Sequence, residues 1–183
     1  NIFVTNGYMT EECLGTLKGL LHAANVDVKS FNDKTYKKVC GARLEPVLKS
    51  VERMRDMGIW VEVTTLIIPT INDSEEELRE IAKWVASIDP GMPWHVSAFY
   101  PAYKMMDLPP TDPKTVERAR EIGLSEGLRY VYTGNIRHGS GENTVCHSCD
   151  ELLIERSGYA ILANNIENRA CPKCKSPTNG VWE

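Results

Sequence analysis

The sequence Val26-Asp27-Val28-Lys29, within residues 24–31 (Ala-Asn-Val-Asp-Val-Lys-Ser-Phe), is the stretch around which the chain is organised. Its apolar and charged residues alternate without a helical period, which predicts a short strand. Residues two apart on a strand share a face, so Asp27 and Lys29 point the same way. Two charges on a buried strand cost on the order of several kcal/mol unless they are paired or bind something. The pair is therefore either a structural ion pair or part of a polar ligand site or catalytic site.

Strand patterns and helical patterns alternate along most of the chain. We predict strands at residues 2–5, 26–29, 59–68, 94–99 and 129–133, and helices at 10–21, 32–39, 44–57, 72–85 and 112–122. Strands that alternate with helices in this way are typical of an α/β fold with a parallel sheet.

Five parallel strands fit either an open doubly wound sheet or one side of a (β/α) barrel. An isolated arc of five strands would leave long hydrophobic edges unpaired. We therefore expect residues 1–135 to form a partial parallel (β/α) barrel, completed by a segment that precedes Asn1. The first residues read as a strand interior without an initiator methionine, which favours a chain cut from a longer protein.

Polar residues recur where the predicted strands end. Asn6, Lys29, the Thr64-Thr65 pair and the loop from Tyr100 to Met106 all follow or close a strand. In parallel α/β sheets and barrels, ligands bind at the carboxyl ends of the strands. This edge of the sheet is the predicted ligand site.

The composition excludes two classes of partner. The net charge is −4 and the pI about 5.7, so no global basic field attracts nucleic acid or an anionic membrane. No apolar stretch approaches the roughly 18 residues of a membrane span. Paired cysteines without a secretory signal favour a reducing, cytoplasmic setting over disulfides.

Residues 144–183 read as a separate small module built around four cysteines. Cys146 and Cys149 form one C-x-x-C pair, and Cys171 and Cys174 form a second. Four thiolates at this spacing suit tetrahedral zinc, and apolar runs on either side of Ser157-Gly158 predict a hairpin between the pairs. The pattern therefore predicts a zinc-ribbon-like β module whose metal site is closed and structural. Iron in a rubredoxin-like site fits the same ligands.

Two further expectations concern the surface of this module. Its basic residues are balanced by acidic ones and offer no stripe for phosphates, so docking to another protein or to the rest of the same chain is favoured over binding to nucleic acid. His147 is expected to be solvent-exposed and not a fifth metal ligand.

Several of these stretches resemble a known enzyme family. Val4-Thr5-Asn6-Gly7-Tyr8, Val26-Asp27-Val28-Lys29-Ser30, Ile67-Ile68-Pro69-Thr70-Ile71-Asn72-Asp73 and Phe99-Tyr100-Pro101-Ala102-Tyr103-Lys104-Met105 resemble strand ends of radical S-adenosylmethionine (SAM) enzymes. The branch in question is related to the pyruvate formate-lyase activating enzymes. Gly141-Glu142-Asn143-Thr144 and Gly180-Val181-Trp182 are similar to the AmmeMemoRadiSam-system radical SAM proteins.

The resemblance implies cofactor-binding roles for four residues. Asp27 and Lys29 would contact SAM or the substrate region, and Asn6 would lie near the SAM ribose. Tyr103 stands where the activating enzymes tend to carry a histidine beside SAM, and Thr64 where they tend to carry an arginine. Because of these two departures, the resemblance does not extend to glycyl-radical activation.

The resemblance also implies a [4Fe-4S] cluster in the parent enzyme. Its ligands would come from a C-x-x-x-C-x-x-C motif, which this sequence does not contain, since Cys13 and Cys40 are lone. We therefore expect the chain to need the missing N-terminal part of the barrel and to perform no radical chemistry alone. The substrate, protein or small molecule, is not readable from these residues.

Two other functions fit the same sequence. Lys29 on a barrel strand could form a Schiff base, as in barrel aldolases, with Asp27 as proton shuttle. Alternatively, the chain is a non-catalytic scaffold whose ribbon recruits a partner. His95 begins a strand and is more readily explained as a structural histidine, and His138 in the glycine-rich linker is a candidate to line an active-site entrance.

Overall fold

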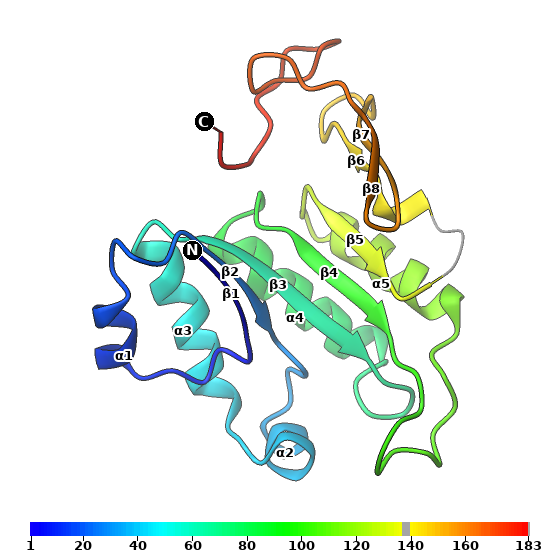
Figure 1. The fold of residues 1–183 in the computed structure, drawn as a ribbon. Coiled ribbons are helices and arrows are strands. Elements are labelled where there is room, and N and C mark those ends of the chain that lie inside the picture. The colour runs from blue at the N-terminus through cyan, green and yellow to red at the C-terminus, as the bar shows by residue number, and fades with distance from the viewer. Residues whose placement is uncertain (137–139, 183) are drawn as a thin grey trace.

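The computed structural model describes residues 1–136 and 140–182. His138 therefore lies outside the described residues. The secondary structure divides into a larger α/β part and a smaller all-β part, which follow one another in the chain (Figure 1).

The larger part is built on a five-stranded sheet, which confirms the predicted α/β fold. Its strands are β1 (Ile2–Thr5), β2 (Ala23–Asp27), β3 (Trp60–Ile67), β4 (Trp94–Ala98) and β5 (Val131–Gly134). They pair in the order β1-β2-β3-β4-β5, and all four pairings are parallel. All the carboxyl ends therefore meet at one edge of the sheet.

One face of the sheet is covered by helices and the other is open. The helices are α1 (Glu11–Thr16), α3 (Leu44–Asp56), α4 (Glu75–Ile88) and α5 (Pro113–Ser125). In Figure 1, α3, α4 and α5 lie behind the sheet. Strand β3 shows the asymmetry, since Val61 and Val63 are buried beneath the helices while Glu62 and Thr64 alternate with them and are half-buried. The open face consequently carries the polar side chains.

The helices begin where the sequence offers a capping side chain. The side chains of Thr10, Ser74 and Asp112 each accept a hydrogen bond from a backbone N–H in the first turn of α1, α4 and α5. Helix α1 is shorter than predicted, because the chain leaves the helix after Thr16 and Gly19 adopts a φ of +75°.

The second strand begins and ends earlier than predicted. It covers Ala23–Asp27 because Ala23 pairs with both Ile2 and Trp60 on the neighbouring strands, which fixes the register. Lys29 therefore follows the strand instead of lying within it. The predicted helical turn after it is confirmed as α2 (Asp33–Thr35) and a π-helix, η1 (Tyr36–Cys40), closed by Gly41 at a φ of +64°.

The smaller part is a three-stranded antiparallel sheet. A short 3-10 helix, η2 (Ser140–Glu142), leads into β6 (Thr144–Val145), β7 (Leu152–Ser157) and β8 (Ala160–Asn164). The predicted hairpin around Ser157-Gly158 joins β7 to β8. In Figure 1 this part, called the ribbon below, stands beside the ends at which the strands of the larger sheet begin. Within the described residues, no helix has the length and apolar character required to cross a membrane.

Candidate functional sites

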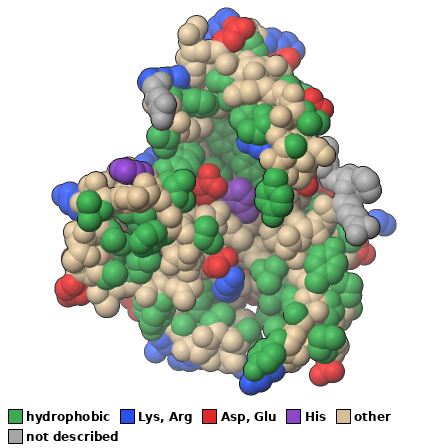
Figure 2. Space-filling view, viewed as in Figure 1, with side chains coloured by type: hydrophobic (Ala, Val, Ile, Leu, Met, Phe, Trp, Pro, Cys, Tyr) green, Lys and Arg blue, Asp and Glu red, His purple; other side chains and the backbone are tan. Residues whose placement is uncertain are grey.

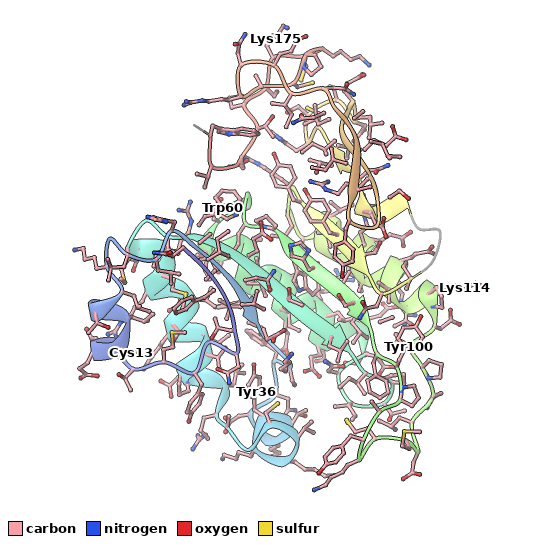
Figure 3. The ribbon with its side chains drawn as sticks, viewed as in Figure 1. Cys13, Tyr36, Trp60, Tyr100, Lys114 and Lys175 are labelled. Atoms are coloured by element: carbon pink, nitrogen blue, oxygen red, sulfur yellow. The ribbon has the colours of Figure 1, made fainter. Side chains whose placement is uncertain are left out.

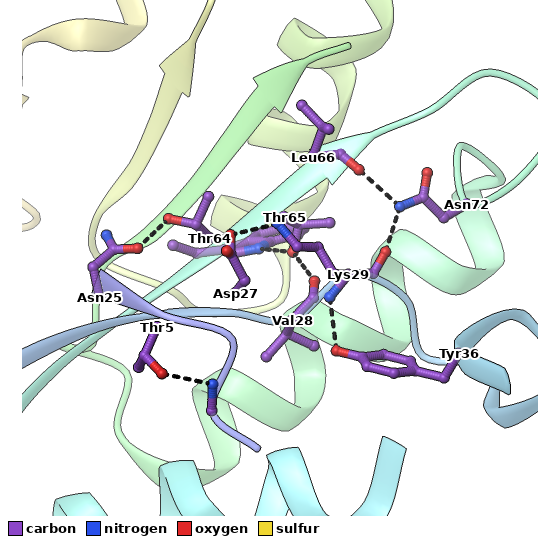
Figure 4. A network of polar contacts seen from close by, with 12 residues as sticks. Thr5, Asn25, Asp27, Val28, Lys29, Tyr36, Thr64, Thr65, Leu66 and Asn72 are labelled. Atoms are coloured by element: carbon purple, nitrogen blue, oxygen red, sulfur yellow. Dashed lines mark hydrogen bonds and ion pairs between the residues drawn. The ribbon is translucent and has the colours of Figure 1, made fainter. Parts of the chain in front are cut away.

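Asp27 and Lys29 meet at the carboxyl edge of the sheet, as the sequence predicts. Lys29 Nζ lies 2.9 Å from Asp27 Oδ1, and the two side chains remain 37% and 27% exposed (Figure 4). A half-exposed ion pair at a strand end is accessible to a ligand, because neither charge is fully enclosed by protein.

The backbone of Lys29 is held from two sides. Its N–H donates to the Tyr36 hydroxyl at 2.9 Å, and its carbonyl accepts from Asn72 Nδ2 at 2.6 Å (Figure 4). Burial raises the pKa of Tyr36 to about 12, which keeps the phenol protonated at neutral pH. The position from which Lys29 presents its side chain is therefore fixed by groups on two other segments.

Asn72 joins the ends of two neighbouring strands. It is 1% exposed, and its Nδ2 also donates to the carbonyl of Leu66 at 2.9 Å, while its Oδ1 accepts from the N–H of Ile68 at 2.6 Å. One amide thereby satisfies three backbone groups at the ends of β2 and β3.

The loop after Lys29 is tied to helix α4. Glu77 Oε1 accepts hydrogen bonds from the Ser30 hydroxyl and, at 2.8 Å, from the N–H of Phe31. Of the three supporting residues, only Asn72 belongs to a strand-end motif quoted above, and no supporting role was predicted for it. Tyr36 and Glu77 lie within helical segments and give no sequence signal of their contacts with this loop.

The other two predicted cofactor contacts lie on the same edge but do not touch the ion pair. Asn6 directly follows β1, the neighbour of β2, and its Oδ1 accepts from the N–H of Tyr8 at 3.0 Å. Tyr103 lies in the loop after β4, is 84% exposed and has Lys104 Nζ 5.3 Å from its ring centroid. The roles of both as cofactor contacts stay predictions.

Thr64 belongs to the open face, one strand away from the pair. Its hydroxyl donates to Asn25 Oδ1 at 2.7 Å, so a neutral hydrogen bond links β2 and β3 at this level (Figure 4).

Tyr36 and Trp60 mark the two ends of the sheet in Figure 3, with Trp60 at the end nearest the ribbon.

The four ribbon cysteines come together as the sequence predicts. Their Sγ atoms all lie within 4.8 Å of one another, with Cys146 Sγ 3.5 Å from Cys174 Sγ and Cys149 Sγ 3.7 Å from Cys171 Sγ. Thiolates at about 2.3 Å from a tetrahedral zinc ion stand roughly 3.8 Å apart. The donor set and its spacing therefore fit a tetrahedral metal ion. His147 is exposed, as expected, and its ring makes an edge contact with Tyr130 at 6.4 Å between centroids.

The N-terminal part of the chain is similar to a known family. Residues 1–85 match the Radical SAM superfamily model. This matched region contains β1 to β3 and therefore Asn6, Asp27 and Lys29.

Two curated relatives match a larger part of the chain. An uncharacterized protein of Methanocaldococcus jannaschii is 44% identical over 177 residues, which are 95% of this chain and 52% of that protein. A protein of Pyrobaculum aerophilum named probable GTP 3′,8-cyclase is 25% identical over 115 residues, which are 56% of this chain and 37% of that protein. The chain thus spans about half the length of the first relative and less of the second.

A solved structure shares the fold. A domain of a pyruvate-formate lyase-activating enzyme from Bacteroides vulgatus superposes with a TM-score of 0.64 over 73% of this chain and 80% of that domain, at 15% identity. At this identity the similarity concerns the fold alone, and it agrees with the α/β architecture found above.

Proposed function

We propose that this chain is the C-terminal part of a radical SAM enzyme of the AmmeMemoRadiSam-system type, in which residues 1–135 supply part of a (β/α) barrel and residues 144–183 a zinc ribbon. The observation that carries the proposal is the Asp27–Lys29 pair, which stands half-exposed at the carboxyl edge of a parallel sheet. The Radical SAM match over residues 1–85 and the similarity in fold support the same class.

The residues at this edge suit the polar groups of SAM. The ammonium of Lys29 can pair with a carboxylate, and the carboxylate of Asp27 can accept hydrogen bonds from ribose hydroxyls. Asn6 adds an amide beside them, and Tyr103 adds a hydroxyl from the loop after β4. Bound SAM supplies a 5′-deoxyadenosyl group for radical chemistry, and these side chains would hold and orient it.

The residues present do not fit the second cofactor of this class. The sequence has no C-x-x-x-C-x-x-C motif, and both cysteines outside the ribbon, Cys13 and Cys40, are exposed. We therefore assign the ligands of a [4Fe-4S] cluster to a segment outside residues 1–183, and we propose that residues 1–183 are inactive alone. The parent's substrate is left open.

The unpaired edge of β1 supports the proposal that a further barrel segment lies outside residues 1–183. Ile2 and Val4 on β1 are 73% and 83% exposed, and β1 pairs only with β2 among the described strands. Exposed apolar edge strands are prone to pair with a further strand. A preceding strand of the same barrel is the occupant that the proposal requires.

The test is calorimetric binding of S-adenosylhomocysteine, which needs no cluster. We expect saturable binding to the full chain, weakened at least about tenfold by Lys29→Met because one charge-assisted contact is lost. Lys83→Met, at an exposed position of α4, is the matched control and should bind as the wild type does. Absence of binding at millimolar ligand, or equal binding by Lys29→Met, would contradict the proposal.

For the ribbon we propose structural zinc. Four thiolates leave no open coordination position, and a closed site stabilises a fold without taking part in catalysis. Elemental analysis should find one zinc per chain and a colourless protein, whereas iron in the same site would give strong visible absorption from thiolate ligation.

The two alternative functions have their own tests. A Schiff-base lysine needs an amine that is free to attack a carbonyl, whereas Lys29 Nζ is engaged by Asp27 Oδ1 at 2.9 Å, so the radical SAM assignment is preferred. Borohydride trapping with a carbonyl compound should give no adduct at Lys29. A pure scaffold should not bind S-adenosylhomocysteine in the experiment above.

A further inference from the structure

A hollow, called the second cleft below, lies between the starts of the strands and the ribbon. It is at the opposite end of the open face from the Asp27–Lys29 pair. Figure 2 shows a recess between the sheet and the ribbon in which hydrophobic, acidic and histidine side chains meet. Its volume is about 860 Å³, and residues from both parts of the molecule line it. Sites for small molecules have volumes of roughly 300–1,000 Å³, so this cleft has the size of a ligand site.

The floor of the cleft is a hydrogen-bonded carboxylate and imidazole on neighbouring strands. His95 Nε2 lies 2.7 Å from Glu62 Oε2, and Trp60 Nε1 donates to Glu62 Oε1 at 3.1 Å. Burial acts to raise the pKa of Glu62, but the hydrogen bond and charge of His95, together with hydrogen bonds from Trp60 and Asn25, lower it below its ordinary value. The carboxylate is therefore ionised at neutral pH and accepts hydrogen bonds only.

The contact with Glu62 determines which ring nitrogen of His95 carries the proton. Since an ionised carboxylate cannot donate, the proton between the two groups belongs to His95 Nε2. In the neutral imidazole, Nδ1 is then a hydrogen-bond acceptor. In the part of the chain that the structure describes, the side chain of His95 makes one hydrogen bond, from Nε2 to Glu62, so no described group donates to Nδ1.

The side wall of the cleft is a stack of flat groups. The rings of His95 and Tyr132 stack with their centroids 5.3 Å apart and an interplanar angle of 29°, and the Arg156 guanidinium lies 5.6 Å from the Tyr132 ring centroid. Thr144 links two members of this stack, since its Oγ1 lies 2.8 Å from the Tyr132 hydroxyl and accepts from Arg156 Nη1 at 2.8 Å. Four further aromatic residues line the cleft: Trp60, Tyr130, Tyr159 and Trp182.

A purely structural role for the Glu62–His95 pair explains the hydrogen bonds but not its surroundings. Both side chains keep about a third of their surface exposed, at 29% for His95 and 32% for Glu62, and they open into a cleft walled by aromatic rings. Aromatic walls favour a flat ring, because stacked rings gain contact area and quadrupole attraction. Because His95 Nδ1 is a hydrogen-bond acceptor on the floor of the cleft, the cleft favours a ring that carries an N–H donor.

We propose that this cleft binds a flat aromatic heterocycle, which stacks between the aromatic side chains and donates an N–H to His95 Nδ1. Glu62 acts as a positioning residue, because it fixes the proton on the other nitrogen of the imidazole. The site is formed jointly by the open face of the sheet and the ribbon. The inference does not depend on the binding of SAM at the other end of the strands.

The test compares benzimidazole with 1-methylbenzimidazole, which has the same ring system but no N–H. Binding to the full chain at pH 8 is followed by quenching of tryptophan fluorescence and by amide chemical shifts. Benzimidazole should bind saturably and perturb residues of β3, β4 and the ribbon, and the methylated probe should bind roughly fivefold more weakly through the loss of one hydrogen bond.

Variants separate the hydrogen bond from simple apolar adsorption. His95→Phe keeps a flat ring but removes the acceptor, so it should bind the two probes equally. His22→Phe changes an exposed histidine whose ring contacts the N-terminal amine instead of lining the cleft, and it should retain the preference. Glu62→Gln no longer fixes the proton and should reduce the preference. Absence of saturable binding, equal affinity of the wild type for both probes, or a preference that survives His95→Phe would each overturn the proposal.

Discussion

The side chains of Tyr36 and Asn72 hold the backbone of Lys29 in place. The hydroxyl of Tyr36 accepts the N–H of Lys29, and the Tyr36 side chain is buried. Tyr36→Phe removes this acceptor and leaves the N–H without its partner, at a cost of about 1 kcal/mol. We expect the affinity for S-adenosylhomocysteine to fall about three- to tenfold while the sheet stays folded, as measured by calorimetry and urea unfolding.

Tyr8→Phe is the matched control, because Tyr8 is half-exposed and its hydroxyl has no hydrogen bond within the described residues. Both variants lose one phenolic oxygen. If Tyr36→Phe binds the ligand as well as Tyr8→Phe does, the Tyr36 hydroxyl does not position Lys29.

At the scale of the elements, the turn after β1 depends on one glycine. Gly7 has a φ of +68°, and a Cβ atom there would stand 2.6 Å from Val26 Cγ1 and 3.2 Å from Val47 Cγ1. Gly7→Ala therefore combines an unfavourable backbone conformation with a clash against β2 and α3, and should lower the free energy of unfolding by roughly 2 kcal/mol. Urea unfolding measures the difference.

Gly15 provides the opposite case within the same segment. It lies in α1, and a Cβ atom there would have no heavy atom within 4 Å. Gly15→Ala should leave stability unchanged or raise it by up to about 1 kcal/mol, because alanine is the better helix former. Equal effects of the two substitutions would contradict this account of the turn.

The joint between α2 and α3 gives a prediction about pH. Asp33 Oδ1 accepts from the N–H of Leu44 at 3.1 Å and from Arg43 Nε at 3.0 Å, and Lys37 Nζ lies 3.1 Å from Oδ2. The Leu44 hydrogen bond, with the two basic side chains, lowers the pKa of Asp33 from 3.8 to about 2. A lowered pKa means that the folded state favours the ionised carboxylate.

The stabilisation by Asp33 is therefore complete above its ordinary pKa of 3.8 and disappears as the pH falls through about 2. Wild type and Asp33→Asn should differ in unfolding free energy at pH 6, and the difference should vanish near pH 2. Thermal unfolding over this pH range measures both. A difference that does not change with pH would mean that the charge of Asp33 has no part in the joint.

Periodicity and capping residues predicted the strands and helices, because each of these signals is local. The capped starts of α4 and α5 and the parallel order of β1 to β5 follow from such signals. The register of β2 could not be predicted, since Ala23 is placed by its pairing with Ile2 and Trp60. The early end of α1 could not be predicted either. Leu14, Leu17 and Leu21 keep a helical spacing through the turn in which Gly19 adopts a positive φ.

The candidate site was predictable only in the part that lies on one strand. Asp27 ends β2 and Lys29 follows two residues later, so the extended backbone at the strand end brings the two side chains together. Asn72 reaches Lys29 across 43 residues of sequence, and Glu62 reaches His95 across 33. Contacts between such distant residues require the fold, which is why the second cleft could not be predicted from the sequence.

At the scale of the whole molecule, the two parts differ in what stabilises them. The sheet and its helices share one large buried core. The ribbon has a small one, in which Cys146, Leu153 and Cys171 are buried and a few partly buried residues pack against them. A core of this size supplies little folding free energy, so the proposed metal ion would provide most of it.

Removal of the metal should therefore unfold the ribbon and spare the sheet. After chelation, or in Cys171→Ser, amide hydrogen exchange in β6 to β8 should accelerate by roughly 100-fold or more, while β2 to β4 keep their protection. Because the ribbon forms one wall of the second cleft, the preference for benzimidazole over its methylated form should disappear in the same samples. Cys13→Ser, which changes an exposed cysteine of α1, should alter neither property. Ribbon amides that stay protected without metal would show that the four thiolates are not what holds this part of the chain together.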